Sequence, residues 1–400
     1  MPTQPPARTS ACRNSDGAGE SLEFHRSEVL AMADKDKPLW TREDHTAAKH
    51  EVLRAYLDAW IPIMGYAALK FESEPRLLLV DGFAGPGRYA GGEPGSPLIM
   101  IDAIVNHSAF PQLEGVNFLL YFIEHDKARI EHLEHEVEQL QLPDNVHVGI
   151  EHGEFEDTFG ELVSVEDGKV LVPTFAFIDP FGYTQAKMSL TGKLLEFPRS
   201  EALFFLPLTD ICRFLSKADQ ASGLDALFGT SRWREAIPME GRARNDFLVD
   251  LFEEQLRAQG QVAHVRSFEM RTAKGRDNRL VFATGHDRGL DAMKNAMWAV
   301  DPVEGRRFVA RTESGQEVLF TPDEDLDTRP LLNQLRAEFG HEWFTIEQAQ
   351  RVTLLSPYKA SHLKKRTLKW AEQELEELEV DRSGGQPKGT FSAGTRMRFR

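Results

Sequence analysis

The chain has 400 residues, and 47 Lys and Arg against 63 Asp and Glu give it a formal net charge of −16. This length predicts two or three domains. The acidic balance argues against a protein that coats nucleic acid over its whole surface, although it is compatible with a local basic patch. The longest apolar runs, such as 77–80 and 202–208, are far shorter than the roughly 18 residues of a membrane helix. We therefore expect a globular chain without a transmembrane segment.

The N-terminal residues and the cysteines indicate the compartment. Residues 1–37 are predicted to form a disordered tail, because they are polar and lack the apolar centre of a secretory signal. Met32 is an alternative start of translation. Cys12 and Cys212 are the only cysteines and lie about 200 residues apart, which excludes a CxxC zinc site and a disulfide framework. A cytoplasmic protein is the default expectation.

Strands and helices are expected to alternate through the first half of the chain. Apolar residues spaced 3.6 apart between Val52 and Met64 predict an amphipathic helix, with a cap at Thr41 and Asp44 in the acidic capping-box position. Short apolar runs that alternate with helices are typical of parallel strands covered on both faces. The expected strands are 76–84, 117–126, 146–153, 174–182 and 201–209, and the expected helices are 95–107, 128–142, 155–163 and 188–197.

The second half completes a sheet. Residues 210–260 are expected to form a mostly helical insertion. Two further strands, 262–271 and 279–286, are joined by a loop too short for a crossover helix, so they should be antiparallel. A helix at 289–300 follows. Right-handed crossovers give a doubly wound α/β sheet, and seven strands with an antiparallel pair at the edge predict a Rossmann-like class I methyltransferase domain over residues 38–310.

The composition changes near the C-terminus. Residues 351–400 hold eleven Lys and Arg but six Asp and Glu, whereas the rest of the chain is acidic. Helices are expected at 330–339 and 345–352, followed by a longer helix from 356 with Pro357 in its first turn. A strand, a glycine-rich turn and another strand end the chain. Three short helices and a β-hairpin predict a winged helix-turn-helix domain over residues 328–400.

A glycine-rich segment follows the first expected strand and contains Asp81, Gly82, Gly85 and Gly87. Glycines at a strand end allow a ligand to approach the backbone closely, at the edge where doubly wound folds bind ligands. A carboxylate there would repel a pyrophosphate, but it suits a cofactor with an ammonium group such as S-adenosylmethionine. We expect these four residues to bind the methionine end of that cofactor. The alternative is a tight turn that needs glycine only for its geometry.

Two further acidic residues follow neighbouring strands. Glu124 ends the second strand and is expected to accept hydrogen bonds from the ribose hydroxyls. It lies about 40 residues beyond the glycines rather than the usual ~20, which implies an insertion at 91–97. Glu154 follows the third strand and is expected to accept from the adenine amino group. Both are also compatible with solvated loop carboxylates.

Asp179, Pro180 and Phe181 end the fourth strand and are the predicted catalytic residues. A carboxylate, a backbone carbonyl and a ring at one point can orient an exocyclic amino group toward a methyl donor while the ring stacks on the base. Pro180 fixes the turn. The alternative is a strand-ending turn with Phe181 in the core. The histidines at strand ends match no metal-binding spacing, so no metal site is predicted; these are His125, His152 and His286.

The basic residues near the C-terminus are candidates for nucleic-acid binding. On the longer third helix they would neutralise phosphates while the helix enters the major groove. The alternative is a protein-docking module, because residues 372–379 reverse the charge. The basic residues expected on this helix are His362, Lys364, Lys365, Arg366 and Lys369, and those expected on the wing include Lys388 and Arg396.

With these motifs the chain resembles the three-Cys-motif partner proteins of bacteria. The resemblance implies a methyltransferase-like domain with a C-terminal winged helix and a partner, encoded nearby, that carries the three cysteines. In the amino-methyltransferases of nucleic acids the fourth strand ends in Asp/Asn-Pro-Pro-aromatic, from which this chain departs. The resemblance rests on Trp40-Thr41, Lys49, Tyr56-Leu57, Asp81–Gly87, Gly95–Pro97, Phe122–Glu124, Phe177–Gly182 and the segment Gly289–Trp298.

The sequence therefore predicts an S-adenosylmethionine-dependent methyltransferase that acts on nucleic acid, with the amino group of a base as the expected acceptor. The alternative is a non-catalytic, methyltransferase-like regulatory protein that docks DNA or a partner enzyme through its winged helix. A cysteine nucleophile is not expected, since neither cysteine lies beside a motif. The sequence leaves open the choice between DNA and RNA, the methylated atom and the oligomeric state.

Overall fold

The computed structural model describes residues 39, 42, 44–164, 172–180, 182, 185–272, 275–309, 326–382 and 386–400. The expected tail at 1–37, the helix cap at Thr41 and the predicted catalytic residue Phe181 lie outside these ranges. Within the described ranges, no helix has both the length and the apolar character needed to cross a membrane.

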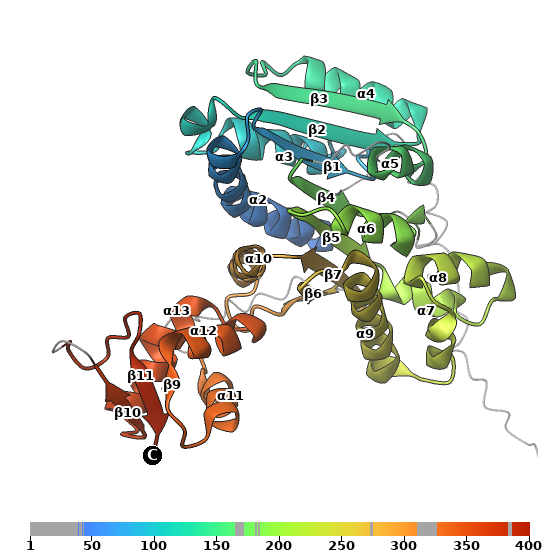
Figure 1. Ribbon diagram of the computed structural model, residues 1–400. Helices are drawn as coiled ribbons and strands as arrows, with labels where there is room; N and C mark the ends of the chain where they lie inside the picture. The colour runs from blue at the N-terminus through green and yellow to red at the C-terminus, as the bar shows by residue number, and fades with distance from the viewer. Residues whose placement is uncertain are drawn as a thin grey trace, which may run out of the picture.

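An eight-stranded sheet in the order β3-β2-β1-β4-β5-β7-β6-β8 forms the centre of the molecule (Figure 1). The first five strands of this order are parallel, and β7 pairs antiparallel with both β5 and β6. This order and the reversed β7 confirm the Rossmann-like class I methyltransferase fold. The strands are β1 (Arg76–Asp81), β2 (Asn117–Glu124), β3 (Val146–His152), β4 (Thr174–Ile178), β5 (Ser200–Leu206), β6 (His264–Arg271), β7 (Asp277–Thr284) and β8 (Arg307–Val309).

Helices cover both faces of the sheet because the strands alternate two apolar surfaces. On β4, Phe175 and Phe177 pack into one core and Ala176 and Ile178 into the other. Helices α2 (Asp44–Phe71), α3 (Ser96–Val105), α4 (Lys127–Glu138) and α10 (Asp287–Val300) lie over the first core, and α5 (Phe155–Val163), α6 (Met188–Leu195), α7 (Leu208–Phe214), α8 (Ala221–Phe228) and α9 (Gly241–Gly260) over the second (Figure 1).

The strands end earlier than expected, and this difference places the acidic residues. Asp81 and Glu124 are the last residues of β1 and β2, whereas the expected strands continued two or three residues further. Asp179 lies just beyond β4 rather than inside it. Gly82 follows Asp81 and Pro180 follows Asp179, and a glycine or a proline favours the end of strand pairing at these two positions. The short strand β8, which pairs parallel with β6, was not expected because it lacks an apolar run.

The C-terminal residues form a unit with a separate apolar core. Its three strands are antiparallel in the order β10-β11-β9. The expected helices and hairpin are present, and the assignment as a winged helix stays a prediction. The elements are α11 (Arg329–Phe339), β9 (Phe344–Thr345), α12 (Ile346–Leu355), α13 (Ala360–His362), the π-helical turn Leu363–Leu368, α14 (Lys369–Gln373), β10 (Leu378–Asp381) and β11 (Arg396–Phe399).

The third helix of this unit differs from the expectation. It begins after Lys359, so Pro357 is not in its first turn but in the preceding connection. The carbonyl of Pro357 accepts a hydrogen bond of 2.8 Å from Trp298 Nε1, which holds this connection outside the helix. The helix is also interrupted, because Leu363–Leu368 is π-helical. Single-turn π segments are frequent at functional sites.

Two cations of the α/β domain cap the end of α12. Lys294 Nζ on α10 donates to Thr353 O at 2.8 Å and to Leu354 O at 3.1 Å. Arg266 on β6 donates to Leu355 O at 2.8 Å. The last carbonyls of a helix lack intrahelical partners and favour nearby cations. These contacts therefore attach the C-terminal unit to α10 and β6.

We expect Lys294→Met to weaken this attachment. The side chain is 2% exposed, and burial lowers the pKa of Lys294 to about 7. The substitution keeps the apolar stem but removes both hydrogen bonds, so Leu354 O loses the donor described for it, whereas Thr353 O still accepts from Ser356. An unpaired buried polar group costs about 1–3 kcal/mol. Thermal unfolding and hydrogen exchange across residues 356–373 measure the loss. Lys70→Met, at an exposed site on α2, is the control, and equal stability of both variants would contradict the prediction.

Candidate functional site

The loop after β1 is bonded to both neighbouring strands. Gly82 N donates to Phe177 O of β4 and Ala84 N donates to Ile123 O of β2, each at 2.9 Å. Gly85 and Gly87 have φ of 65° and 79°, in the left-handed region that glycine adopts without strain. These two glycines are therefore required by the turn itself. The loop lies across the carboxyl ends of β2, β1 and β4, where the sequence placed the cofactor.

Asp81 is a fully buried carboxyl group at the end of β1. Its Oδ1 accepts a hydrogen bond of 3.1 Å from Phe83 N. Oδ2 is buried and makes no well-formed hydrogen bond among the described residues, although the Ser96 hydroxyl lies near enough to oppose the rise in the pKa of this carboxyl group. Burial raises the pKa of Asp81 to about 7, and the negative charges of Asp179 and Glu124 add to this effect. The structure thus brings the three predicted carboxylates into one electrostatic neighbourhood.

Glu124 fixes the glycine loop to the end of β2. It is 2% exposed, and its Oε2 accepts from Gly85 N at 2.9 Å. Its Oε1 accepts from the backbone of His125 and Asp126 at 3.1 and 2.9 Å. His125 Nδ1 and the buried Arg129 guanidinium also lie 3.1 and 3.7 Å from Oε1. A carboxylate has about four acceptor positions, so the position left for a further donor is on Oε2. The reading of Glu124 as a solvated loop residue is therefore wrong.

Glu154 has a different environment. It is exposed at the N-terminus of α5 and makes no capping hydrogen bond. Next to it, Phe155 stacks on Phe83 of the glycine loop with ring centroids 5.0 Å apart, and a Cβ at Gly82 would lie 2.6 Å from the Phe155 ring. The end of β3 therefore contacts the loop through Phe155, while Glu154 remains an open carboxylate.

Asp179 is paired with a cation that the sequence analysis did not place in the site. Lys49 Nζ on α2 lies 2.5 Å from Asp179 Oδ2, and the two side chains are 6% and 21% exposed. The same ammonium lies 4.1 Å from the centre of the Phe205 ring at the end of β5. Pro180 is buried beside them. A signal was present, because Lys49 occupies the apolar face of its helix together with Val52.

Neutral aromatic groups surround this ion pair. Burial lowers the pKa of His45 to about 4 and that of His50 to about 3, and repulsion by Lys49 contributes to both shifts. Burial, with the charges of Asp179 and Asp81, raises the pKa of Tyr89. The site therefore presents a paired cation and carboxylate beside uncharged rings.

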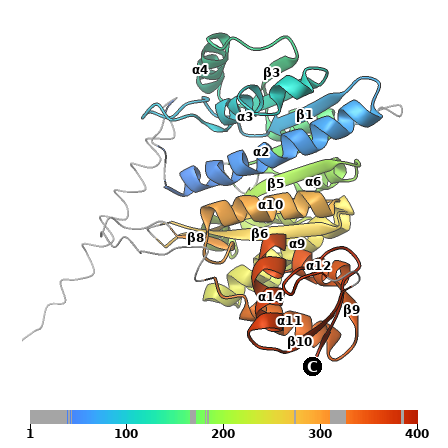
Figure 2. The same ribbon diagram turned by 90° about the vertical axis from the view of Figure 1, so that its left-hand side faces the viewer.

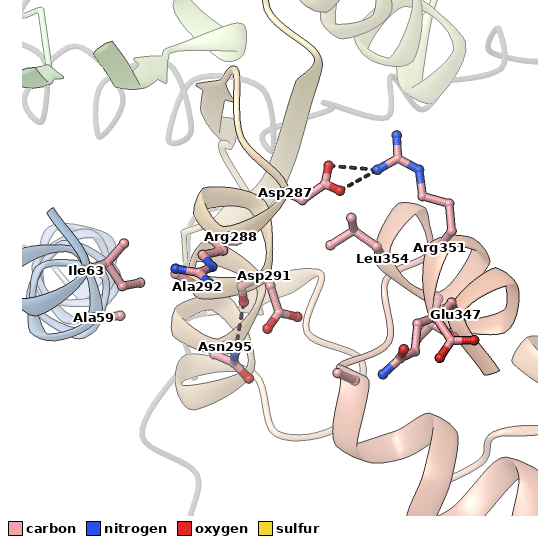
Figure 3. A pocket seen from close by; sticks show the side chains of 13 residues that line it. Ala59, Ile63, Asp287, Arg288, Asp291, Ala292, Asn295, Glu347, Arg351 and Leu354 are labelled. Atoms are coloured by element: carbon pink, nitrogen blue, oxygen red, sulfur yellow. Dashed lines mark hydrogen bonds and ion pairs between the residues drawn. The ribbon is translucent and has the colours of Figure 1, made fainter. Parts of the chain in front are cut away.

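Two cavities lie elsewhere in the described part of the chain. One of about 480 Å³ lies between α2, α10 and α12; Figure 3 shows Arg351 of α12 pointing at Asp287 of α10, and their ion pair measures 2.7 Å. The other, of about 580 Å³, lies between α2 and α3. Neither is lined by Asp81, Glu124 or Asp179.

The basic C-terminal residues are only partly available for binding. The expectation that His362 lies on the binding face is wrong, because its side chain is buried and packs edge-on against Trp298 at 4.5 Å. Lys364 and Arg366 are half-buried. The remaining candidates are exposed, namely Lys365, Lys369, Lys388 and Arg396.

The histidines at the strand ends are surface residues. His125, His152 and His286 are all exposed, and His152 Nε2 lies 3.0 Å from the backbone carbonyl of His125. In the part of the chain that the structure describes, no group of three or more His, Cys, Asp or Glu side chains is arranged to hold a metal ion.

Comparison of the sequence with protein-family models and with curated proteins finds no match. Among solved structures, the chain is similar to Trm1 from Pyrococcus horikoshii with S-adenosyl-L-methionine, at 11% identity over 91% of this chain and 92% of that one, with a TM-score of 0.34. It is also similar to an O-methyltransferase from Bacillus cereus with SAH, at 12% identity over 68% and 93%, with a TM-score of 0.32. These similarities are weak, and the fold assignment rests on the strand order.

We expect the burial of Asp81 to give the ligand-free protein a characteristic pH dependence. Its folded-state pKa of about 7 exceeds the unfolded value of about 3.9, so the folded protein keeps a proton that the unfolded chain loses. Stability should therefore fall as pH rises from about 4 to about 7. Asp81→Asn should remove this component and be the more stable protein at pH 8. Urea unfolding at pH 5 and pH 8 tests this.

The matched control is Asp144→Asn, because Asp144 is exposed. That variant should follow the wild-type pH profile. Parallel profiles for Asp81→Asn and wild type would show that Asp81 does not retain its proton in the folded state.

Proposed function

We propose that this chain is an S-adenosylmethionine-dependent methyltransferase that acts on nucleic acid. The observation that carries the proposal is the buried Oδ2 of Asp81, which makes no well-formed hydrogen bond among the described residues. A buried carboxylate is unfavourable unless a cation pairs with it. The ammonium group of a methionine moiety supplies that cation, and glycines at positions 82, 85 and 87 allow its close approach.

The roles of the remaining residues follow from their positions. Glu124 has acceptor capacity for one ribose hydroxyl, and the exposed Glu154 is available to the adenine amino group. When bound, the cofactor supplies an activated methyl group next to Asp179 and Pro180. The residues of the site act by positioning and electrostatics. Cys212 takes no part, because it lies on α7 with its Sγ 3.4 Å from Asn245 Oδ1, and burial raises its pKa.

The exposed basic residues of the C-terminal unit support a nucleic-acid substrate. Trp343 lies beside the exposed Arg396 and the half-buried Arg398, whose guanidinium groups are 5.3 and 4.9 Å from its ring; Arg398 also donates to Glu379 Oε2 at 2.6 Å. Aromatic rings flanked by arginine stack on bases while the cations contact phosphates. Lys365 and Lys369 on the third helix are exposed as well.

We expect the chain to bind S-adenosylmethionine and to lose this binding when Asp81 is changed. Asp81→Asn removes the charge but keeps the shape, so affinity should fall at least about tenfold, which corresponds to about 1.4 kcal/mol. Glu124→Gln should weaken binding less, since an amide oxygen still accepts one of the backbone bonds. Isothermal calorimetry measures both changes. Asp144→Asn serves again as the exposed control.

A second candidate is the non-catalytic, methyltransferase-like regulatory protein. It is favoured by the three backbone donors that already engage Glu124 and by the position of the two described cavities away from the three carboxylates. Wild-type protein that fails to bind S-adenosylmethionine would support this candidate. Binding without methyl transfer to RNA or DNA would also support it.

We expect the basic surface to contribute electrostatic binding of nucleic acid. Replacing both Lys365 and Lys369 by Ala should weaken binding and reduce the salt dependence of the affinity by up to about two contacts. Fluorescence anisotropy with a mixed-sequence oligonucleotide at 50–200 mM salt, a range of ionic strength over which such contacts weaken by orders of magnitude, measures this. Replacing the exposed Lys70 and Lys127 by Ala is the matched control. Equal slopes of affinity against salt concentration for the two double variants would contradict the prediction.

The partner protein with three cysteines and the cytoplasmic location stay predictions of the sequence analysis. The same holds for membership of the three-Cys-motif partner family.

A further inference from the structure

The ion pair of Lys49 and Asp179 lies beside the loop that the proposed function assigns to the methyl donor. Asp179 is close enough to Asp81 for its charge to act on that carboxyl group. Since only 6% of the Lys49 side chain is exposed, water screens this pair weakly. An acceptor that reaches the methyl donor over Asp179 therefore lies beside this ion pair.

The charge that develops on the acceptor atom distinguishes two kinds of acceptor. An amino nitrogen becomes positive as it takes a methyl group, and a neighbouring ammonium opposes this change. A hydroxyl oxygen must lose its proton, and negative charge builds on it as the O–H bond breaks. A carboxylate that takes the proton and a cation that stabilises the oxygen favour this reaction. The pair at 2.5 Å matches the second case.

We propose that the acceptor is a ribose 2′-hydroxyl of RNA, with Asp179 as the base and Lys49 as the cation on the acceptor oxygen. This inference rests on the proposed function and replaces its expected amino acceptor. The 2′-hydroxyl is the group that distinguishes an RNA strand from DNA. Lys49 donates a hydrogen bond to Asp179 Oδ2, so Oδ1 is the oxygen that would accept the proton of the hydroxyl.

The transfer balances without a further reagent. The acceptor O–H bond breaks and its proton passes to the carboxylate of Asp179. The new oxygen–methyl bond forms while the methyl–sulfur bond breaks, and its electron pair stays on sulfur. The positive charge of the sulfonium group is thereby lost, and the proton leaves Asp179 for solvent when the product departs.

The surroundings of the pair fit an RNA strand. Phe205 is buried beneath Lys49 and stacks against His45, with centroids 6.2 Å apart and planes at 23°, so apolar rings hold the ammonium in place. Arg276, on the connection between β6 and β7, acts electrostatically on His45. The positive charge of Arg276 would suit the phosphate next to the acceptor ribose.

Product analysis of the full chain tests the proposal. The protein is incubated with methyl-labelled S-adenosylmethionine and either total RNA or genomic DNA, and the nucleic acid is digested to nucleosides. We expect label in 2′-O-methylribonucleosides, at linkages that resist alkali. Label on a base nitrogen would overturn the inference and leave the proposed function intact. No transfer to either nucleic acid would reject the proposed function, and the inference with it.

Variants at position 49 provide a second test with a readout other than turnover. Binding of one RNA and the DNA of the same sequence is compared in the presence of S-adenosylhomocysteine. Wild type should prefer RNA, and Lys49→Met should reduce that preference about tenfold, because one charge-assisted hydrogen bond to the hydroxyl is lost. Lys49→Arg, which keeps the charge, should restore part of it. An unchanged preference in Lys49→Met would overturn the role of Lys49.

Lys70→Met is the matched control. Lys70 lies on the same helix and its ammonium also lies over a phenylalanine ring, 5.0 Å from the centre of Phe71, but at the far end of α2. This variant should keep the wild-type preference for RNA. S-adenosylhomocysteine affinity should change less than about twofold in both variants, which separates acceptor recognition from cofactor binding.

Discussion

The confinement of three carboxylates at one edge of a sheet governs the architecture of the site. Asp81, Glu124 and Asp179 end neighbouring parallel strands or follow them directly. The negative charge of each carboxylate is accommodated in a different way. Glu124 accepts three backbone hydrogen bonds, and Asp179 pairs with Lys49. Asp81 keeps one oxygen without a well-formed hydrogen bond among the described residues and has a raised pKa. Asp81 differs from the other two carboxylates in this respect, which indicates that a positively charged ligand is needed beside Asp81.

The sequence predicts the carboxylates because their placement is a local property. A parallel strand is a short apolar run, and the residues that end it occupy the carboxyl edge whatever the rest of the fold does. The same reasoning gave the strands to within a few residues and the antiparallel β6–β7 pair. It failed to place Lys49, which meets Asp179 across 130 residues of chain. Pairing of that kind depends on where α2 packs, and periodicity gives the buried face of a helix but not its neighbours.

The connection of the two units shows a similar limit. Lys294 and Trp298 belong to a segment that the sequence analysis singled out only through a resemblance. In the structure both residues donate hydrogen bonds to the C-terminal unit. They bond carbonyls at Thr353, Leu354 and Pro357, where α12 ends and the connection to the next helix begins. No spacing rule links a lysine on one helix to the last turn of another, so the sequence could not assign these residues.

Helix α2 joins these two features. Its first turns supply His45, Lys49 and His50 to the candidate site, and its middle is fixed to the sheet by Tyr56, whose hydroxyl donates to the buried Glu201 on β5 at 2.5 Å. This contact lies deep in the core, where burial raises the pKa of Glu201. Along the same face α2 runs beside α10 (Figure 2), which carries the lysine that caps α12. The ion pair at the candidate site and the attachment of the basic C-terminal unit therefore rest on two adjacent helices, and packing fixes the position of that unit relative to the site.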